Sequence, residues 1–232
     1  MILIRQLAND FLGLLFPHLC NSCGTQLFYG EKEICTKCRY DLPFTDFQNY
    51  AANPVAKLFW GRIPCNGAMA MLYFRKASKV QHLIHRLKYK DQTETGIELG
   101  KLLGERLLAS PIYQTASLII PVPLHPKKQK SRGYNQSEYI AKGIAEIMQV
   151  PISTKHLIRQ YHTSTQTKKG RYNRFENMQS VFKILNAEQL ENQHVLLVDD
   201  VITTGSTLEA CGIALLATPI KQLSIAALAY SE

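Results

Sequence analysis

One segment of the chain restricts the fold more than any other. It runs from Val195 to Leu208 with the sequence VLLVDDVITTGSTL, and it joins an apolar run, two acids, a hydroxyl-rich turn and a helical pattern. A short, continuous apolar run is typical of a parallel strand buried on both faces. In an open parallel sheet, ligands bind beyond the carboxyl ends of the strands, which is where this pattern places Asp199 and Asp200. The segment therefore predicts an α/β fold with a ligand site at that edge of the sheet.

The rest of the chain continues an alternation of strand and helix patterns. Apolar or β-branched runs predict strands, and apolar residues at helical spacing predict helices. The predicted strands are 67–74, 117–122, 195–198 and 223–228, and the predicted helices are 78–89, 97–108, 136–148 and 207–217. This alternation indicates a mostly parallel sheet flanked by helices. The stretch from Asp46 to Pro64, which contains Asn53-Pro54 and Gly61, is interpreted as a loop at a domain boundary.

The residues after the predicted strand at 195–198 suit a phosphorylated sugar. Ionised carboxylates such as Asp199 and Asp200 can accept hydrogen bonds from both hydroxyls of a vicinal ribose diol. The turn that follows opens a helix, whose free backbone N–H groups and positive dipole end bind anions. We therefore expect a ribose 5-phosphate site formed by Asp199, Asp200, Thr203, Thr204, Gly205, Ser206 and Thr207. Ser206 with Glu209 also fits a capping box, which would start a helix without any ligand.

Two other nucleotide-binding patterns are absent from the sequence. The chain contains neither the Gly-x4-Gly-Lys-Ser/Thr pattern of a P-loop nor the GxGxxG pattern of a dinucleotide site. We therefore exclude these two enzyme classes.

Four cysteines form a CxxC-x11-CxxC array, Cys20, Cys23, Cys35 and Cys38. Two such pairs can complete the tetrahedral four-thiolate shell that zinc prefers, so we expect a structural Zn²⁺ site. The alternative is a set of buried or redox-active thiols. We expect a small module over residues 1–50, made of an amphipathic helix from Met1 to Leu19 and this zinc finger, followed by a larger domain over residues 60–232.

The charge balance favours an anionic partner. Lys and Arg number 27 against 18 Asp and Glu, which gives a formal net charge of +9. Such a balance suits a nucleic acid or a phosphorylated small molecule and does not choose between them. The sequence holds no unbroken apolar stretch of about 18 residues and no secretory signal pattern. We therefore expect a cytoplasmic protein without a membrane span.

The chain resembles the ComF family along nearly its full length. The stretch from Leu197 to Leu208 looks like the phosphoribosyl pyrophosphate signature of type I phosphoribosyltransferases. The other matching motifs are the four cysteines, Leu87-Lys88-Tyr89, Pro121-Val-Pro-Leu, the RGYNQ motif at 132–136, Thr163 with Gln166, and Arg174 with Asn177. One departure is Lys169, where the family tends to carry leucine.

This resemblance implies a four-cysteine zinc finger joined to a phosphoribosyltransferase-like domain of type I, and a role in DNA uptake during natural transformation with proteins of the uptake machinery as partners. It implies a diphosphate-contacting loop after the strand from Leu118 to Val122, and a mobile loop from Thr163 to Asn177. The candidate diphosphate and lid contacts are Arg132, Gln166, Lys168 and Arg174. The alternative is that these basic stretches are only a solvated face or a disordered loop. His82 and His85 are interpreted as structural.

Two functions follow as hypotheses. In the first, the domain binds phosphoribosyl pyrophosphate with Mg²⁺, and Asp199, Asp200 and Arg132 support transfer of ribose 5-phosphate to an acceptor. The sequence identifies no acceptor and leaves open whether turnover occurs. In the second, the chain is a non-catalytic single-stranded DNA-binding protein that keeps the sugar site as a sensor or a strand contact. Cations interleaved with aromatics support it, at Lys37, Arg39, Tyr40, Arg171 and Tyr172.

Overall fold

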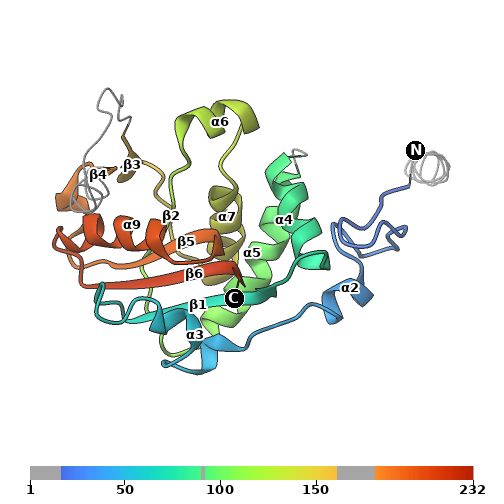
Figure 1. The fold of residues 1–232 in the computed structure, drawn as a ribbon, viewed down its shortest axis with the longest axis horizontal. Coiled ribbons are helices and arrows are strands. Elements are labelled where there is room, and N and C mark those ends of the chain that lie inside the picture. Colours follow the sequence, from blue (N-terminus) through green and yellow to red (C-terminus); the bar gives the residue numbers. More distant parts are fainter. Residues whose placement is uncertain (1–16, 90–91, 161–180, 232) are drawn as a thin grey trace, which may run out of the picture.

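A four-stranded parallel sheet forms the centre of the molecule (Figure 1). The computed structural model describes residues 17–89, 92–160 and 181–231. The strand order is β1-β6-β5-β2, and each pair of neighbours is parallel. The strands are β1 (Gly67–Phe74), β2 (Leu118–Pro121), β5 (His194–Ile202) and β6 (Gln222–Ser231). The predicted parallel α/β sheet is therefore confirmed, with Ile152 forming a further parallel bridge to Ile119 at the β2 edge.

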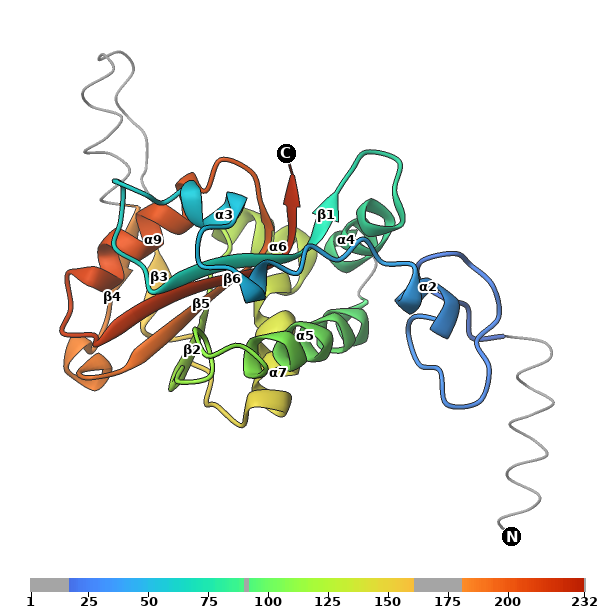
Figure 2. The same ribbon diagram turned by 90° about the horizontal axis from the view of Figure 1, so that it is seen from below.

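Helices cover both faces of this sheet. Figure 2 shows α5 and α7 below the sheet, while α9 and α3 lie above it. The helices are α3 (Pro54–Lys57), α4 (Lys79–Tyr89), α5 (Thr93–Leu108), α7 (Gln136–Met148) and α9 (Ser206–Leu216). Helices α5 and α7 pack closely at Gly143. A Cβ at this position would lie 2.0 Å from the carbonyl oxygen of Ile97, so the absence of a side chain permits the approach. The four helices predicted from apolar spacing are thus confirmed, with ends that differ by a few residues at most.

The predicted loop from Asp46 to Pro64 is wrong in part, because it contains a short 3₁₀ helix, η1 (Phe47–Asn49), and α3. The Asn53-Pro54 pair begins α3 rather than breaking structure. The Asn53 side chain accepts a hydrogen bond from the Ala56 N–H at 2.9 Å and donates to the Ala68 carbonyl at 2.9 Å, and proline suits the first helical position. This capping lets Val55 and Phe59 become fully buried.

Several short elements complete the fold and were not predicted. They are α2 (Thr36–Tyr40), α6 (Pro126–Arg132), the antiparallel pair β3 (Leu157–Arg159) and β4 (Phe182–Ile184), and η2 (Ala187–Leu190). The basic run that follows β2 thus forms helix α6.

Strand β5 is longer than its apolar run predicts. It continues through Ile202, so Asp199 and Asp200 lie within the strand and not beyond it. The neighbouring β6 supplies the reason, because its register extends to pair Asp199 with Ala227 and Val201 with Ala229. An acid pair in a paired strand is held more rigidly than one in a loop.

Apolar residues form one large core around the sheet and a small cluster at the cysteines. Cys20, Cys35 and Cys38 are buried together, with Leu27 and Ile34 packed against them. Figure 2 shows that the segment leading to α2 lies beside α4, at one end of the sheet. The division of the chain near residue 50 stays a prediction. No helix in the described part of the chain is long and apolar enough to span a bilayer, and the predicted helix from Met1 lies largely outside that part.

Candidate functional site

The acid pair on β5 is held by residues from two helices. Asp199 Oδ1 accepts hydrogen bonds from the Ser137 hydroxyl at 3.0 Å and from the Asp200 backbone N–H at 2.9 Å. Ser137 lies in the first turn of α7. Asp200 Oδ2 lies 2.7 Å from Lys88 Nζ, near the end of α4. Sequence reasoning assigned a role to neither Ser137 nor Lys88, although Lys88 belongs to one of the quoted motifs.

These surroundings change the acidity of Asp199. Burial, followed by the negative charge of Asp200, raises the pKa of Asp199 from 3.8 to about 7. The Asp200 N–H, the Ser137 hydroxyl and the Lys88 ammonium group act in the opposite direction and limit the rise. Such a carboxyl changes its protonation near neutral pH, which is frequent at functional sites.

The turn after β5 begins helix α9 through a left-handed glycine. Gly205 is the residue that caps α9 and has a φ of 75°, which only glycine adopts without strain. Its Cβ position lies 3.1 Å from the Phe59 ring, so a side chain there would also require the Phe59 ring to shift slightly. The Thr204 hydroxyl lies 2.9 Å from the Ser206 hydroxyl. The free N–H groups at the start of this 11-residue helix can bind an anion.

The alternative capping box of Ser206 and Glu209 is wrong. Gly205 occupies the capping position, and no side chain caps the helix. The Glu209 carboxylate instead pairs with the Arg62 guanidinium. Arg62 also donates to the Thr204 carbonyl at 3.0 Å and to the Leu58 carbonyl at 2.9 Å. Arg62 therefore fixes the turn from outside, and the separation of 147 positions between Arg62 and Glu209 explains why no sequence pattern reveals it.

The RGYNQ motif at 132–136 connects the acid pair to β2 and α4. The Tyr134 hydroxyl donates to the Leu87 carbonyl at 2.5 Å, and the Asn135 side chain donates to the Val122 carbonyl at 3.0 Å. The Asn135 side chain also caps α7 by accepting from the Ser137 N–H. These bonds fix the start of α7, and so hold the Ser137 hydroxyl within hydrogen-bond distance of Asp199. The motif thus has a structural task that its match to a family pattern does not show.

Of the residues predicted to contact the diphosphate, only some lie in the part of the chain that the structure describes. Arg132 ends α6 and donates to Gln136 Oε1 at 2.9 Å, and its side chain is half-buried. The lysines of α6, at 127, 128 and 130, are exposed. Gln166, Lys168 and Arg174, with the whole predicted mobile loop from Thr163 to Asn177, lie outside the described residues. His82 and His85 are exposed on α4.

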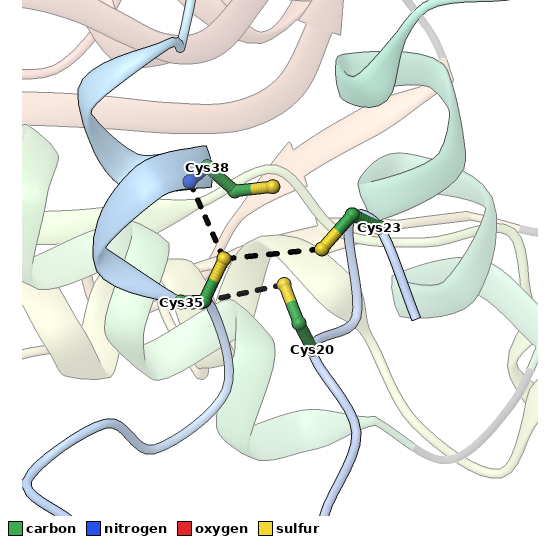
Figure 3. A group of neighbouring side chains, drawn as sticks. All are labelled: Cys20, Cys23, Cys35 and Cys38. Atoms are coloured by element: carbon green, nitrogen blue, oxygen red, sulfur yellow. Dashed lines mark hydrogen bonds between the residues drawn. The ribbon is translucent and has the colours of Figure 1, made fainter. Parts of the chain in front are cut away.

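The four cysteines converge as their spacing predicts (Figure 3). Their sulfurs all lie within 4.8 Å of one another, and Cys23 Sγ lies 3.8 Å from Cys35 Sγ. A tetrahedral site with Zn–S bonds of about 2.3 Å separates its sulfurs by about 3.8 Å. The backbone N–H groups of Cys35 and Cys38 donate to the sulfurs of Cys20 and Cys35, as dashed lines in Figure 3 mark. The cluster is therefore compatible with a metal ion that is bound by four thiolates.

A buried asparagine attaches this cluster to the larger core. The Asn21 amide nitrogen lies 2.6–2.7 Å from oxygens of Glu33, Gln92 and Thr95, and its amide oxygen accepts from Arg86 Nη1 at 2.7 Å. Asn21 is 5% exposed and lies between Cys20 and Cys23. The cysteine cluster and the region of α4 and α5 are thus joined by one side chain that sequence reasoning missed.

Comparisons with known proteins agree with this arrangement. Residues 135–231 match the family model of the phosphoribosyl transferase domain. Competence protein F of Haemophilus influenzae is 31% identical over 220 residues, which cover 92% of this chain and 85% of that protein. The DNA utilization protein YhgH of Escherichia coli (strain K12) is 26% identical over 209 residues, covering 84% of this chain and 88% of that protein.

Competence protein ComFC of Bacillus subtilis is 29% identical over 91 residues, which cover 39% of this chain and 35% of that protein. The match to competence protein F extends over both the cysteine cluster and the phosphoribosyl transferase domain, so the chain belongs to the ComF family.

Proposed function

We propose that the chain binds a ribose 5-phosphate group that carries a diphosphate on its anomeric carbon, as in phosphoribosyl pyrophosphate. The observation that carries this proposal is the position of two acids near the carboxyl end of β5, followed directly by the glycine-capped start of α9. Asp199 and Asp200 accept hydrogen bonds from the sugar diol, and the N–H groups from Ser206 onward bind the 5-phosphate.

The diphosphate would lie toward α6, where Arg132 ends the helix. Mg²⁺ accompanies the ligand in this proposal and is held mainly by its diphosphate oxygens. Transfer of the ribosyl group breaks the bond from the anomeric carbon to the diphosphate and forms one to an acceptor nucleophile. Such a reaction depends on positioning and on charge stabilisation of the leaving group, so it needs no protein nucleophile. The names of the relatives, competence protein and DNA utilization protein, support a role in DNA uptake, and we propose that role for this chain.

Calorimetric titration with phosphoribosyl pyrophosphate and Mg²⁺ tests the binding proposal. We expect the Asp199→Asn, Asp200→Asn double variant to lose at least tenfold in affinity, because charge-assisted hydrogen bonds to the sugar are removed. The matched control is Asp41→Asn. Asp41 pairs with Lys79, which lies in the first turn of α4, at the opposite end of that helix from Lys88. Unchanged affinity in the double variant, or equal loss in the control, would contradict the proposed site. Diphosphate release with a panel of nucleobases then tests turnover.

We propose that the metal at the four cysteines is a structural Zn²⁺. The donor set supports it, because four thiolates form the closed shell typical of structural zinc. Hydrogen bonds from the Thr25 hydroxyl, 2.9 Å from Cys23 Sγ, and from the Thr25 backbone lower the pKa of the Cys23 thiol to about 6, which favours the thiolate that a metal needs. Within this proposal the zinc holds the knuckles together and takes no part in transfer.

A second candidate function is binding of single-stranded DNA, and the surface of the cysteine module favours it. Phe28, Tyr29 and Tyr40 are 77%, 108% and 87% exposed, and the exposed cations Lys37 and Arg39 lie on α2 with Tyr40. Exposed rings that stack on bases, together with cations, hold single strands without sequence preference. This function is compatible with a sugar phosphate site elsewhere on the chain.

Fluorescence anisotropy with a labelled oligothymidylate tests this second function. We expect the affinity to fall steeply with salt, because cations that contact phosphates release counterions. Tyr40→Ala is expected to weaken binding by about 5- to 150-fold, since stacking contributes about 1–3 kcal/mol per base. Tyr50→Ala is the control, because Tyr50 is 53% exposed but lies outside the stretch from Cys20 to Tyr40 that carries the four cysteines and α2. Absence of binding at low salt, or equal effects of the two variants, would refute it.

A further inference from the structure

The last turn of α4 contacts three separate parts of the molecule through three consecutive residues. Arg86 donates a hydrogen bond of 2.7 Å to Asn21, which lies between Cys20 and Cys23 of the cysteine cluster. The Leu87 carbonyl accepts from the Tyr134 hydroxyl at 2.5 Å, and Lys88 Nζ lies 2.7 Å from Asp200 Oδ2. Both neighbours of Lys88 in this turn are therefore fixed, and the direction in which its side chain leaves the helix is fixed with them.

Lys88 contacts the carboxylate of Asp200, which is one of the two groups proposed to accept hydrogen bonds from the sugar. Its side chain is 25% exposed and that of Asp200 is 13% exposed, so the pair is shielded but not sealed from solvent. If Asp200 accepts a hydrogen bond from the ribose, the ammonium group must share that carboxylate or move to another anion. Lysine suits such a change, because its charge sits on a flexible four-carbon chain with freely rotating donors.

The ligand itself offers that other anion. In a ribose the 2-hydroxyl and the anomeric substituent are on adjacent carbons. A cation within hydrogen-bond distance of the carboxylate that binds the diol therefore starts close to any phosphate group on the anomeric carbon. In the ligand-free chain the same cation pairs with Asp200 and so reduces the repulsion between Asp200 and its neighbour Asp199.

We propose that Lys88 is a ligand-binding residue that selects sugars with a phosphate or diphosphate on the anomeric carbon over sugars with a free anomeric hydroxyl. This inference rests on the proposed function and goes beyond it, because it names the residue that distinguishes the two ligand classes. Lys88 pairs with Asp200 in the free chain and contacts the anomeric phosphate in the complex. A purely structural counter-ion would instead support the acid pair equally for both ligands.

Calorimetry with two ligands separates these roles. The full, zinc-loaded chain is titrated with phosphoribosyl pyrophosphate and with ribose 5-phosphate, both in the presence of Mg²⁺. We expect Lys88→Gln to lose about 10- to 100-fold in affinity for phosphoribosyl pyrophosphate, the effect of one charged hydrogen bond. Its affinity for ribose 5-phosphate is expected to be unchanged or higher, because the competing cation is gone. Lys88→Arg is expected to retain most of the preference.

The control is Lys79→Gln, which removes a lysine from the first turn of the same helix, where it pairs with Asp41 at 3.1 Å. It is expected to change neither affinity. Equal weakening for both ligands in Lys88→Gln, or no change for either, would overturn the assignment and leave the proposed function standing. A wild-type chain that binds neither ligand would overturn the proposed function and this assignment with it.

A second measurement requires no variant. Lysine acetylation of the wild-type chain by acetic anhydride, read by mass spectrometry, is compared with each ligand at saturation. We expect phosphoribosyl pyrophosphate to protect Lys88 more strongly than ribose 5-phosphate does, because only the former has an anomeric anion. Equal protection by the two ligands would overturn the proposal.

Discussion

Arg86 Nη1 donates a hydrogen bond of 2.7 Å to Asn21 Oδ1, and this contact joins the cysteine knuckle to the helix that carries Lys88. Asn21 is buried between two of the clustered cysteines, and Lys88 lies two residues after Arg86. The cysteine cluster and the acid pair on β5 are thereby connected through the last turn of α4. The segment that carries the cysteines is thus attached to the helix that reaches the candidate sugar site.

Replacing Asn21 with alanine is expected to lower the free energy of unfolding by about 1–3 kcal/mol, because buried Thr95 and the partly buried Glu33, Gln92 and Arg86 lose their hydrogen bonds to it. Urea denaturation measures the change. The control is Arg39→Ala, which removes the 3.8 Å contact with Glu105 between largely exposed side chains and should cost less than about 1 kcal/mol. If both variants lose the same amount, Asn21 is not the principal attachment.

Zinc content provides a test of the cysteine cluster. We expect one equivalent of zinc per chain, and Cys38→Ser is expected to lose most of it because serine does not supply a thiolate. Cys65→Ser is the matched control, since Cys65 is a free thiol outside the cluster. Chelation is also expected to unfold the region before about residue 45, measured by amide hydrogen exchange. Full zinc content in Cys38→Ser would contradict the four-thiolate site.

Two glycine variants separate backbone strain from packing at the phosphate turn. Gly205 and Gly61 have φ angles of 70–75°, but only the Gly205 Cβ position meets a neighbour, the Phe59 ring at 3.1 Å. Gly61→Ala is expected to cost about 1–2 kcal/mol of stability through backbone strain alone. Gly205→Ala is expected to cost about 1–3 kcal/mol more, through overpacking. Thermal denaturation checks both, and equal losses would show that the Phe59 contact is unimportant.

The raised pKa of Asp199 predicts a dependence of stability on pH. Its pKa is about 7 in the folded chain against 3.8 in the unfolded chain, so the folded chain binds more protons between these values. The contribution of Asp199 to the free energy of unfolding therefore falls as pH rises from about 4 to about 7. Asp199→Asn removes this contribution and retains an oxygen that can accept from Ser137.

We expect Asp199→Asn to be more stable than the wild type above pH 7 and equally stable below pH 4, measured by urea denaturation across pH. A stability difference that does not change with pH would show that Asp199 keeps its ordinary acidity in the folded chain.

Patterns confined to a short stretch of chain predicted their structures well. The bounds predicted for β1 and α7 agree with the structure, because an apolar run or a helical period is a property of neighbouring residues. The Asn53-Pro54 pair failed as a loop signal because the same two residues also begin a helix, and only burial of Val55 and Phe59 decides between these outcomes. Likewise, Asp199 and Asp200 belong to β5 because β6 extends beside them.

The sequence by itself determined the succession along the chain of the four sheet strands and the four longer helices, the acid pair followed by a glycine turn, and the cysteine spacing, since each depends on local periodicity or spacing. Only the tertiary structure decided which side chains surround these groups. Ser137 reaches Asp199 across 62 residues, Arg86 reaches Asn21 across 65, and Arg62 reaches Glu209 across 147. Such contacts carry no sequence period, because they form where helices and strands from distant parts of the chain pack at one edge of the sheet.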